Sequence, residues 1–503
     1  MSFVYVKELV RRILSLSIAT GCLLMARPQA LGFSMVGPFP AWQVQTIGYS
    51  VPNSIEIGGP MNLGEEYRWN RPVITYGFTS AFYNYFGNQG AAEIDAAFQI
   101  LQDLPETTKM SDDLSEFPLD TRRVNFRAAA LDVISLRAVA LNEVIAYMGL
   151  SEPERYTWTL RGRRIQDELI TYTVLKRNFD PITWEPSSFV NGSLYTYIIE
   201  QTWANVWEAV PYLVDPLRPG VTSVAGLGTP GQIGDLTPNV FNSGLFVNGL
   251  TRDDAGGLRY IYRPNNYNIE NLPPDAELNF EAFLSGGLGS PWAFPGETLF
   301  PPPLNPFLPP LFGTNTIPII NITNIFSVPT NFPITDTALR RGVDKLNYQR
   351  MNQDSFLDNI FTPVTNSYVD SYVSNRTLVT QPLQLVSTAP DFVFDAEDLG
   401  LAANVAVPVR LTHTLSPFQN NAALNGPSVV SGPGTIDAPI TITFSSIGPF
   451  FVNAIPTDSP NNPSEETAFL GVVWGSFDAS TNAPIIFPSG ESIRELEKRV
   501  LGF

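Results

Sequence analysis

The chain has 503 residues, of which 44% are hydrophobic and 16% are charged, and its formal net charge is −18. That length suits two or three globular domains, and the negative charge excludes a general nucleic-acid binder, which needs clustered cations. The chain has one histidine, His413, and one cysteine, Cys22. This scarcity excludes His-rich and four-cysteine zinc sites, disulfide frameworks and Cys–His nucleophilic dyads.

The first 30 residues have the pattern of a signal peptide. Lys7, Arg11 and Arg12 precede an apolar run over residues 13–26, and small residues follow up to Ala30. The run is short for a bilayer span and suits export with cleavage near Ala30. A lipid anchor at Cys22 is the alternative, although the residues before Cys22 match that signal less well. No later apolar stretch has the length of a membrane span, so we expect no transmembrane helix in the mature chain.

Residues 31–70 are rich in glycine and proline and predict an extended leader. Residues 71–270 predict a mixed α/β domain with a strand at 73–78 and an amphipathic helix at 91–104. Further helices are predicted over 126–150 and within 193–214, and Thr251 predicts the cap of another helix.

The second half of the chain predicts fewer helices and more strands than residues 71–270 do. Residues 285–335 combine many prolines with aromatic side chains, which predicts a linker that wraps against a domain. Residues 336–503 predict a mostly β, sandwich-like domain. Its expected elements are a short helix near 337–346, strands at 405–411, 438–444, 469–474 and 483–487, and a terminal helix at 493–501. The expected fold class is therefore α+β.

The segment over residues 139–150 carries the most specific motif. Glu143 lies on a predicted helix, and Gly149 followed by Leu150 ends that helix. This stretch resembles the active-site helix of the matrixins, a metzincin-type family of zinc peptidases. The strand "VITYGF", the helix "GAAEIDAAFQIL" and the closing segment "LTRDDAGGLRYIY" are similar to other parts of that family, in the same order. The resemblance covers about residues 70–263, with an insertion at about 155–245, and implies a metzincin-like α/β domain.

The zinc ligands of the family are missing. The resemblance assigns the general base to Glu143 and the turn glycine to Gly149, but Asn142, Ala146 and Glu152 stand where the three histidines belong. Asparagine and alanine cannot supply the imidazole nitrogens that hold catalytic zinc, and without the metal Glu143 has no activated water. We therefore expect a pseudoenzyme with no required cofactor, in which Glu143 is a vestigial base. Zinc is expected only if an atypical site forms around Glu143. Calcium could bind Asp253 and Asp254, which a helix first turn also explains.

The C-terminal region has a resemblance of its own. The stretches "APDFVFDAEDLGL" and "WGSFDASTNAPIIFP" look like the tails of large exported proteins of the Planctomycetes–Verrucomicrobia group. The expected function is a non-catalytic structural, adhesive or assembly role at the cell envelope or outside the cell, with an envelope partner or self-assembly and no nucleic acid. Two alternatives remain: a secreted metalloendopeptidase with an atypical site at Glu143, and a polysaccharide-binding protein.

Overall fold

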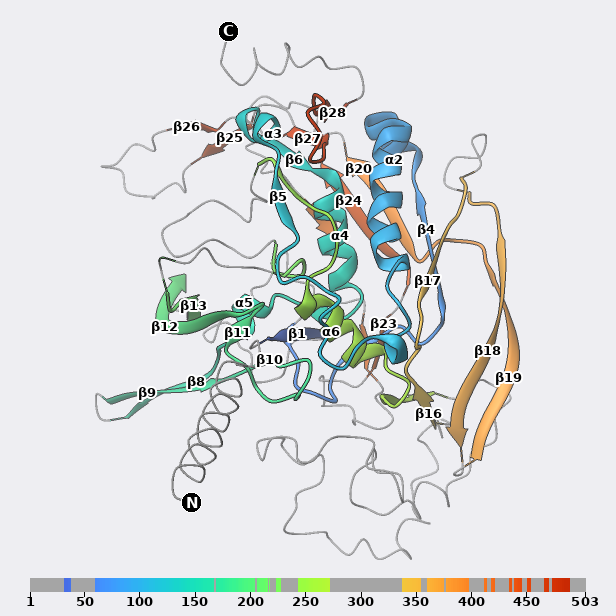
Figure 1. The fold of residues 1–503 in the computed structure, drawn as a ribbon, viewed down its shortest axis with the longest axis horizontal. Helices are drawn as coiled ribbons and strands as arrows, with labels where there is room; N and C mark the ends of the chain where they lie inside the picture. The colour runs from blue at the N-terminus through green and yellow to red at the C-terminus, as the bar shows by residue number, and fades with distance from the viewer. Residues whose placement is uncertain are drawn as a thin grey trace, which may run out of the picture.

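The protein has an α+β fold in which a few helices pack among several small sheets (Figure 1). None of the described helices combines the length and the apolar character needed to cross a bilayer. The computed structural model describes residues 31–37, 59–166, 169–203, 206–215, 217, 223–227, 243–271, 337–353, 360–374, 377–397, 411–413, 418–420, 434–436, 438–445, 450–453, 466–469 and 473–488.

The largest sheet joins strands from both halves of the chain. Its order is β17-β4-β20-β24-β21. The first four strands run parallel and β21 is antiparallel to β24. The strands are β4 (Val73–Phe78), β17 (Asn347–Arg350), β20 (Phe392–Glu397), β21 (Leu411–His413) and β24 (Ile440–Ser445). The strands predicted at 73–78 and 438–444 are thus present. The sheet crosses the boundary expected between a domain at 71–270 and a separate β domain at 336–503, because both neighbours of β4 come from the later region.

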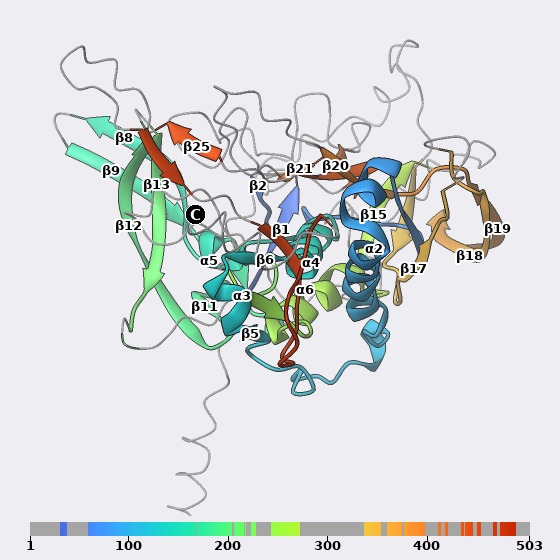
Figure 2. The same cartoon turned by 90° about the horizontal axis from the view of Figure 1, so that it is seen from above.

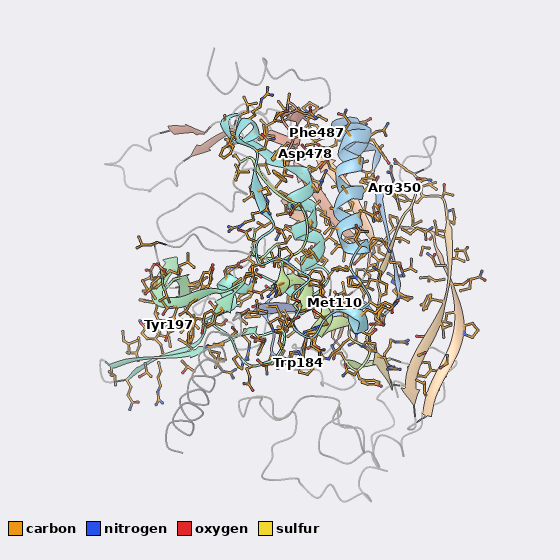
Figure 3. All side chains as sticks on the ribbon, viewed as in Figure 1. Met110, Trp184, Tyr197, Arg350, Asp478 and Phe487 are labelled. Carbon is orange, nitrogen blue, oxygen red and sulfur yellow. The ribbon has the colours of Figure 1, made fainter. Side chains whose placement is uncertain are left out.

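Helix α2 (Ser80–Gln102) covers one face of this sheet (Figure 1). The helix predicted at 91–104 is present but begins earlier, because the hydroxyl of Thr79 accepts a hydrogen bond from the Phe82 amide at 3.1 Å. Gly87 has a φ of 62°, which kinks the helix. The ring of Phe86 lies 5.9 Å from that of Phe444 and 5.3 Å from that of Phe487. Figure 3 shows Phe487 beside the upper end of α2, so the last described residues belong to the same core.

Parts of the expected extended leader are buried strands. Strand β1 (Phe33–Gly37) is buried along its whole length. It pairs with three strands that surround it, namely β2 (Gly59–Pro60), β7 (Leu150–Ser151) and β10 (Asn178–Phe179). The prediction of an extended leader is wrong for this strand, because its alternate apolar residues Phe33 and Met35 belong to the main core.

The helix predicted over 126–150 is divided into three elements. Helix α3 (Phe126–Ala130) ends before Asp132, whose φ of 56° is incompatible with a right-handed helix. Strand β6 (Val133–Ser135) then pairs with β27 (Val473–Ser476) in parallel. Helix α4 (Leu136–Ala146) follows and packs against α2. The single-helix prediction is wrong because the β-branched residues of β6 find a strand partner far along the chain.

The region expected as an insertion forms hairpins that project from the rest of the molecule (Figure 2). Strands β8 (Thr159–Gln166) and β9 (Leu169–Leu175) form one hairpin, and β12 (Ser193–Trp203) and β13 (Val206–Leu213) form another. Strand β11 (Phe189–Val190) borders β12. The helix predicted within 193–214 is therefore wrong. The alternation of Tyr195, Tyr197 and Ile199 places them on one face. The ring of Tyr197, which Figure 3 labels, packs on the ring of Trp158, directly before β8, with centroids 4.9 Å apart.

A four-stranded antiparallel sheet lies beyond β17, on the opposite side from those hairpins (Figure 2). Its order is β15 (Tyr267–Asn271), β16 (Thr337–Arg341), β18 (Val364–Ser374) and β19 (Thr377–Ser387). The short helix predicted near 337–346 is wrong, because residues 337–341 pair with β15 along their whole length.

The other described elements are short. They are α5 (Pro153–Tyr156), α6 (Arg252–Tyr262), η2 (Thr107–Lys109), β3 (Tyr67–Arg68), β5 (Arg122–Val124), β14 (Leu245–Val247), β22 (Phe418–Asn420), β23 (Gly434–Ile436), β25 (Phe450–Asn453), β26 (Glu466–Phe469) and β28 (Ile485–Ile486). Strands β27 and β28 fall within or beside the strands predicted at 469–474 and 483–487. The signal peptide, Cys22, the linker at 285–335, residues 405–410 and the helix at 493–501 lie outside the described residues.

Candidate functional site

The helix that resembles the matrixin active-site helix is α4. The hydroxyl of Ser135 caps it by accepting a hydrogen bond from the Ala138 amide at 3.2 Å. Its C-terminal turn reaches Gly149, whose φ is 100°. A Cβ at Gly149 would lie 2.6 Å from the carbonyl oxygen of Tyr67, so this position needs glycine for both its conformation and its space. The turn leads directly into β7.

Asn142 points its amide at another segment of the chain. The side chain is buried, and its Nδ2 donates to the carbonyl oxygens of Val224 at 2.8 Å and Ala225 at 3.0 Å. We call residues 223–227, a short described turn, the plug segment. Residues 223–226 are buried although no strand or helix contains them. Buried backbone outside regular structure needs hydrogen-bond partners from elsewhere, and Asn142 supplies part of them.

Two carboxylates hold the amide groups of the same plug segment. Oε1 of Glu154, on α5, accepts from the Ser223 amide at 3.0 Å. Asp254, on α6, accepts from the Val224 amide at 2.8 Å through Oδ2 and from the Ala225 amide at 3.0 Å through Oδ1. Side chains from α4, α5 and α6 thus bind both the donors and the acceptors of one short backbone turn. These contacts hold the plug segment against the three helices.

The plug segment is also fitted by shape. A Cβ at Gly226 would lie 1.9 Å from Oε2 of Glu154, so any larger residue would displace the carboxylate or the turn. The Gly226 amide donates to the hydroxyl of Ser223 at 2.9 Å, which closes the turn on itself. The plug segment can therefore pack this closely against Glu154 only with glycine at position 226.

The start of α6 gives the site its rigidity. Thr251 and Asp254 form a capping box, as the acidic first turn predicts. The amide of Asn191 donates to Oδ2 of Asp253 at 2.5 Å, and its side-chain Nδ2 donates to the hydroxyl of Thr251 at 3.0 Å. Burial raises the pKa of Asp253 well above its usual range, and burial also raises the pKa of Asp254 against the effect of its hydrogen bonds. Oδ2 of Asp253 and both carboxylate oxygens of Asp254 thus accept hydrogen bonds from backbone amides.

The other positions that the matrixin resemblance singled out, Ala146, Glu143 and Glu152, lie near this site, and each has a different environment. Ala146 is half-buried, packs against the main core and offers only a methyl group. Glu143 is half-buried on α4, and its charge acts on Glu152. Glu152 precedes α5, and its Oε2 is buried without a hydrogen-bond partner among the described residues. Burial raises the pKa of Glu152 to about 7, Arg155 opposes that shift, and the charges of Glu154, Glu143 and Glu208 add to it.

The site brings together some of the residues that the sequence singled out and adds others. Asn142, Glu143 and Glu152 lie around the ends of α4 and α5, and Asp254 joins them through the plug segment. Among the described residues, no group of three or more His, Cys, Asp or Glu side chains is placed to hold a metal ion. Sequence reasoning missed the plug segment and the role of Glu154. The one signal for them is Gly226, within a run of small residues.

Comparisons with known proteins add no relative. No protein-family model matches the chain, no curated protein sequence matches it, and no solved structure matches its fold.

Proposed function

We propose that this chain is an exported, non-catalytic protein with a structural, adhesive or assembly role, built on a degenerate matrixin-like domain. The observation that carries the proposal is the bond between Asn142 and the plug segment, at 2.8 and 3.0 Å. Asn142 occupies the position of the first histidine ligand in the resemblance. Its amide hydrogens already bind the chain's own backbone, so this position contributes to internal packing.

The neighbouring groups support the same interpretation. Oε1 of Glu154 and both carboxylate oxygens of Asp254 accept hydrogen bonds from backbone amides of the plug segment. A zinc ion at Asn142 would need an imidazole in place of the amide and would need the plug segment to leave. The order of β4, α2, α4 and α6 along the chain is the order of the four matrixin-like motifs. This order supports kinship with a peptidase scaffold in which the former metal site now binds the plug segment.

The test compares the wild-type chain with Glu143→Gln, which changes a half-buried side chain and leaves the plug segment in place. Metal analysis of the purified chain is expected to find no stoichiometric zinc. Casein incubated with either protein is expected to stay uncleaved, with and without a chelator. Intact mass spectrometry after expression in an exporting host is expected to show the loss of residues 1–30.

The competing function is a secreted metalloendopeptidase. About one zinc per chain, together with chelator-sensitive cleavage that Glu143→Gln abolishes, would establish it and overturn the proposal. Retention of residues 1–30 in the exported fraction would overturn the export part alone.

A further inference from the structure

Strand β19 forms an edge of its sheet, and its hairpin carries an uncharged outer face. Among the described residues, β18 is its only strand neighbour. The two strands pair over 11 consecutive positions without a bulge. Strand β19 has no charged residue, and the one charged residue of β18, Asp370, is buried and ion-paired with Arg340. The outer face of this hairpin is therefore uncharged, although the chain has a net charge of −18.

The outer face is well exposed. Side chains alternate between the two faces of a strand, so the odd-numbered residues from 365 to 371 in β18 and the even-numbered residues from 378 to 386 in β19 share this face. Val369 is 63% exposed, Leu378 is 53% exposed and Val386 is 55% exposed. The opposite face includes buried Asp370 and Tyr372, which contact Arg340 of β16. The sheet therefore has an inner face toward the protein and an outer face toward solvent.

The outer face has a pattern that is symmetric about its centre. The register pairs alternate in character along the hairpin: pairs with aliphatic residues lie at both ends and at the centre, and polar pairs lie between them. In order, the pairs are Thr365–Val386, Ser367–Gln384, Val369–Pro382, Ser371–Thr380 and Val373–Leu378.

A two-fold axis along the central pair would stack this face on a second copy with matching chemistry. Val369 would meet Val369, and Pro382 would meet Pro382. Leu378 would meet Val386, while Thr380 would meet Gln384. A two-fold contact requires such a self-complementary patch, because each surface must fit its own copy.

We propose that the outer face of the β18–β19 hairpin is a homodimer interface, in which two copies of this chain stack face to face about a two-fold axis through Val369 and Pro382. This dimer makes the proposed assembly role specific, because the partner is a second copy of the chain. Its biological role rests on the proposed function, whereas its geometry does not. Pro382 in the middle of β19 lacks an amide hydrogen, which disfavours extension of the sheet edge and favours stacking of the face.

The size and the charge of the surface set the expected strength. Eleven residues span about 37 Å, and two strands are about 10 Å wide, so each copy contributes about 400 Å² in projection. A standard interface needs about 800 Å² per partner, so the dimer is expected to be weak and reversible. Because two copies with charges of −18 repel each other at long range, added salt is expected to strengthen the dimer.

Sedimentation of the full chain over loading concentrations from about 1 to about 100 µM tests the proposal. The wild-type mass is expected to rise from monomer toward dimer, and more so at high salt. Val369→Lys places two lysines side by side at the axis and should weaken association at least about tenfold. Val369→Asp should do the same, while an equimolar mixture of the two variants should dimerise again. Ile165→Lys on β8, where the side chain is 59% exposed, is the matched control and should dimerise as the wild type does.

Three results would overturn the proposal: a wild-type chain that stays monomeric, a Val369→Lys variant that dimerises normally, or a mixture of the charged variants that remains monomeric. All substituted side chains are exposed, so circular dichroism should be unchanged and a folding defect is readily recognised. A monomeric chain without zinc or cleavage would overturn the dimer and leave the non-catalytic function standing. Zinc-dependent cleavage by a chain that does dimerise would overturn the non-catalytic function and leave the dimer standing.

Discussion

Asn142 shows how one buried side chain on a helix can bind the backbone of a distant segment. An imidazole at this position could bind a metal through a ring nitrogen, whereas the amide of Asn142 donates to two buried carbonyl oxygens. Those carbonyl groups belong to Val224, whose oxygen also accepts from the Leu227 amide at 3.2 Å, and to Ala225. An unsatisfied buried carbonyl has a cost in free energy that the amide removes.

Replacing Asn142 with alanine should therefore destabilise the fold. The variant leaves two buried carbonyl groups without this donor and opens a small cavity, so we expect the free energy of unfolding to fall by about 1–3 kcal/mol. Urea denaturation followed by tryptophan fluorescence measures the change. The matched control is Asn482→Ala at an exposed position, which should stay within about 0.5 kcal/mol of the wild type. Equal stability of Asn142→Ala and wild type would mean that the plug segment does not depend on this amide.

Burial moves the pKa of Glu152 toward neutral pH. Its ordinary pKa is 4.5, and burial raises the value to about 7 in the fold. Between these two pH values, the native state keeps a proton that the unfolded chain has lost. Stability linked to Glu152 therefore falls as pH rises from 4.5 to 7, and above 7 the full penalty of an ionised, buried carboxylate remains. Arg155 offsets part of this penalty, and Glu143, Glu154 and Glu208 increase it.

Glu152→Gln should stabilise the protein at alkaline pH. A pKa shift from 4.5 to about 7 corresponds to a free energy on the order of 3 kcal/mol. The free energy of unfolding of Glu152→Gln should exceed that of the wild type by this amount at pH 8 and equal it near pH 4. Unfolding free energies measured across that range give the profile. Glu106→Gln, at a side chain that is 40% exposed, should change stability by less than about 1 kcal/mol at either pH. A difference between Glu152→Gln and wild type that does not depend on pH would contradict the raised pKa.

At the scale of elements, the sequence predicted those with local signals. Strand β4 has β-branched and aromatic residues, the later part of α2 has helical periodicity, and α6 begins with the capping box of Thr251 and Asp254. Each of these signals lies within a few residues of the element that it specifies. The turn glycine Gly149 belongs to the same group, since its φ of 100° is a local requirement.

The elements that sequence reasoning missed depend on distant partners. Val133 and Ile134 lie within the stretch predicted as one helix, but in the fold they pair with Val473 and Trp474. The segment 193–203 has aromatic residues at spacings that suit either structure, and its pairing with 206–213 decides in favour of strands. A propensity of a few tenths of a kcal/mol per residue is readily outweighed by packing against partners elsewhere in the chain.

The candidate site divides in the same way. The matrixin-like motif pointed to Asn142, Glu143 and Glu152, which do lie around one region. The plug segment enters from residues 223–227, and nothing in its own sequence requires a position against α4. Its partners Glu154 and Asp254 read as ordinary acidic residues in helix first turns, since hydrogen bonds to a distant backbone leave no pattern in the chain.

At the scale of the whole molecule, β4 needs the later part of the chain on both sides. Strand β17 pairs with it at one edge and β20 at the other. The ring of Phe394 lies 5.9 Å from that of Phe78 and 5.9 Å from that of Phe98, so β20 also completes the core beneath α2. Parallel pairing between such distant segments makes folding depend on the whole chain.

We therefore expect neither half of the chain to fold alone. A fragment of residues 31–271 would leave both edges of β4 open and the apolar face of α2 exposed, and residues 337–503 would lack the strand between β17 and β20. Each fragment should unfold without cooperativity in urea. Co-expressed fragments should associate and recover a cooperative transition, because the sheet and the core are then complete. Two independent cooperative transitions, one from each separate fragment, would show instead that the boundary expected near residue 336 divides two autonomous domains and that the pairing of β4 contributes little to folding.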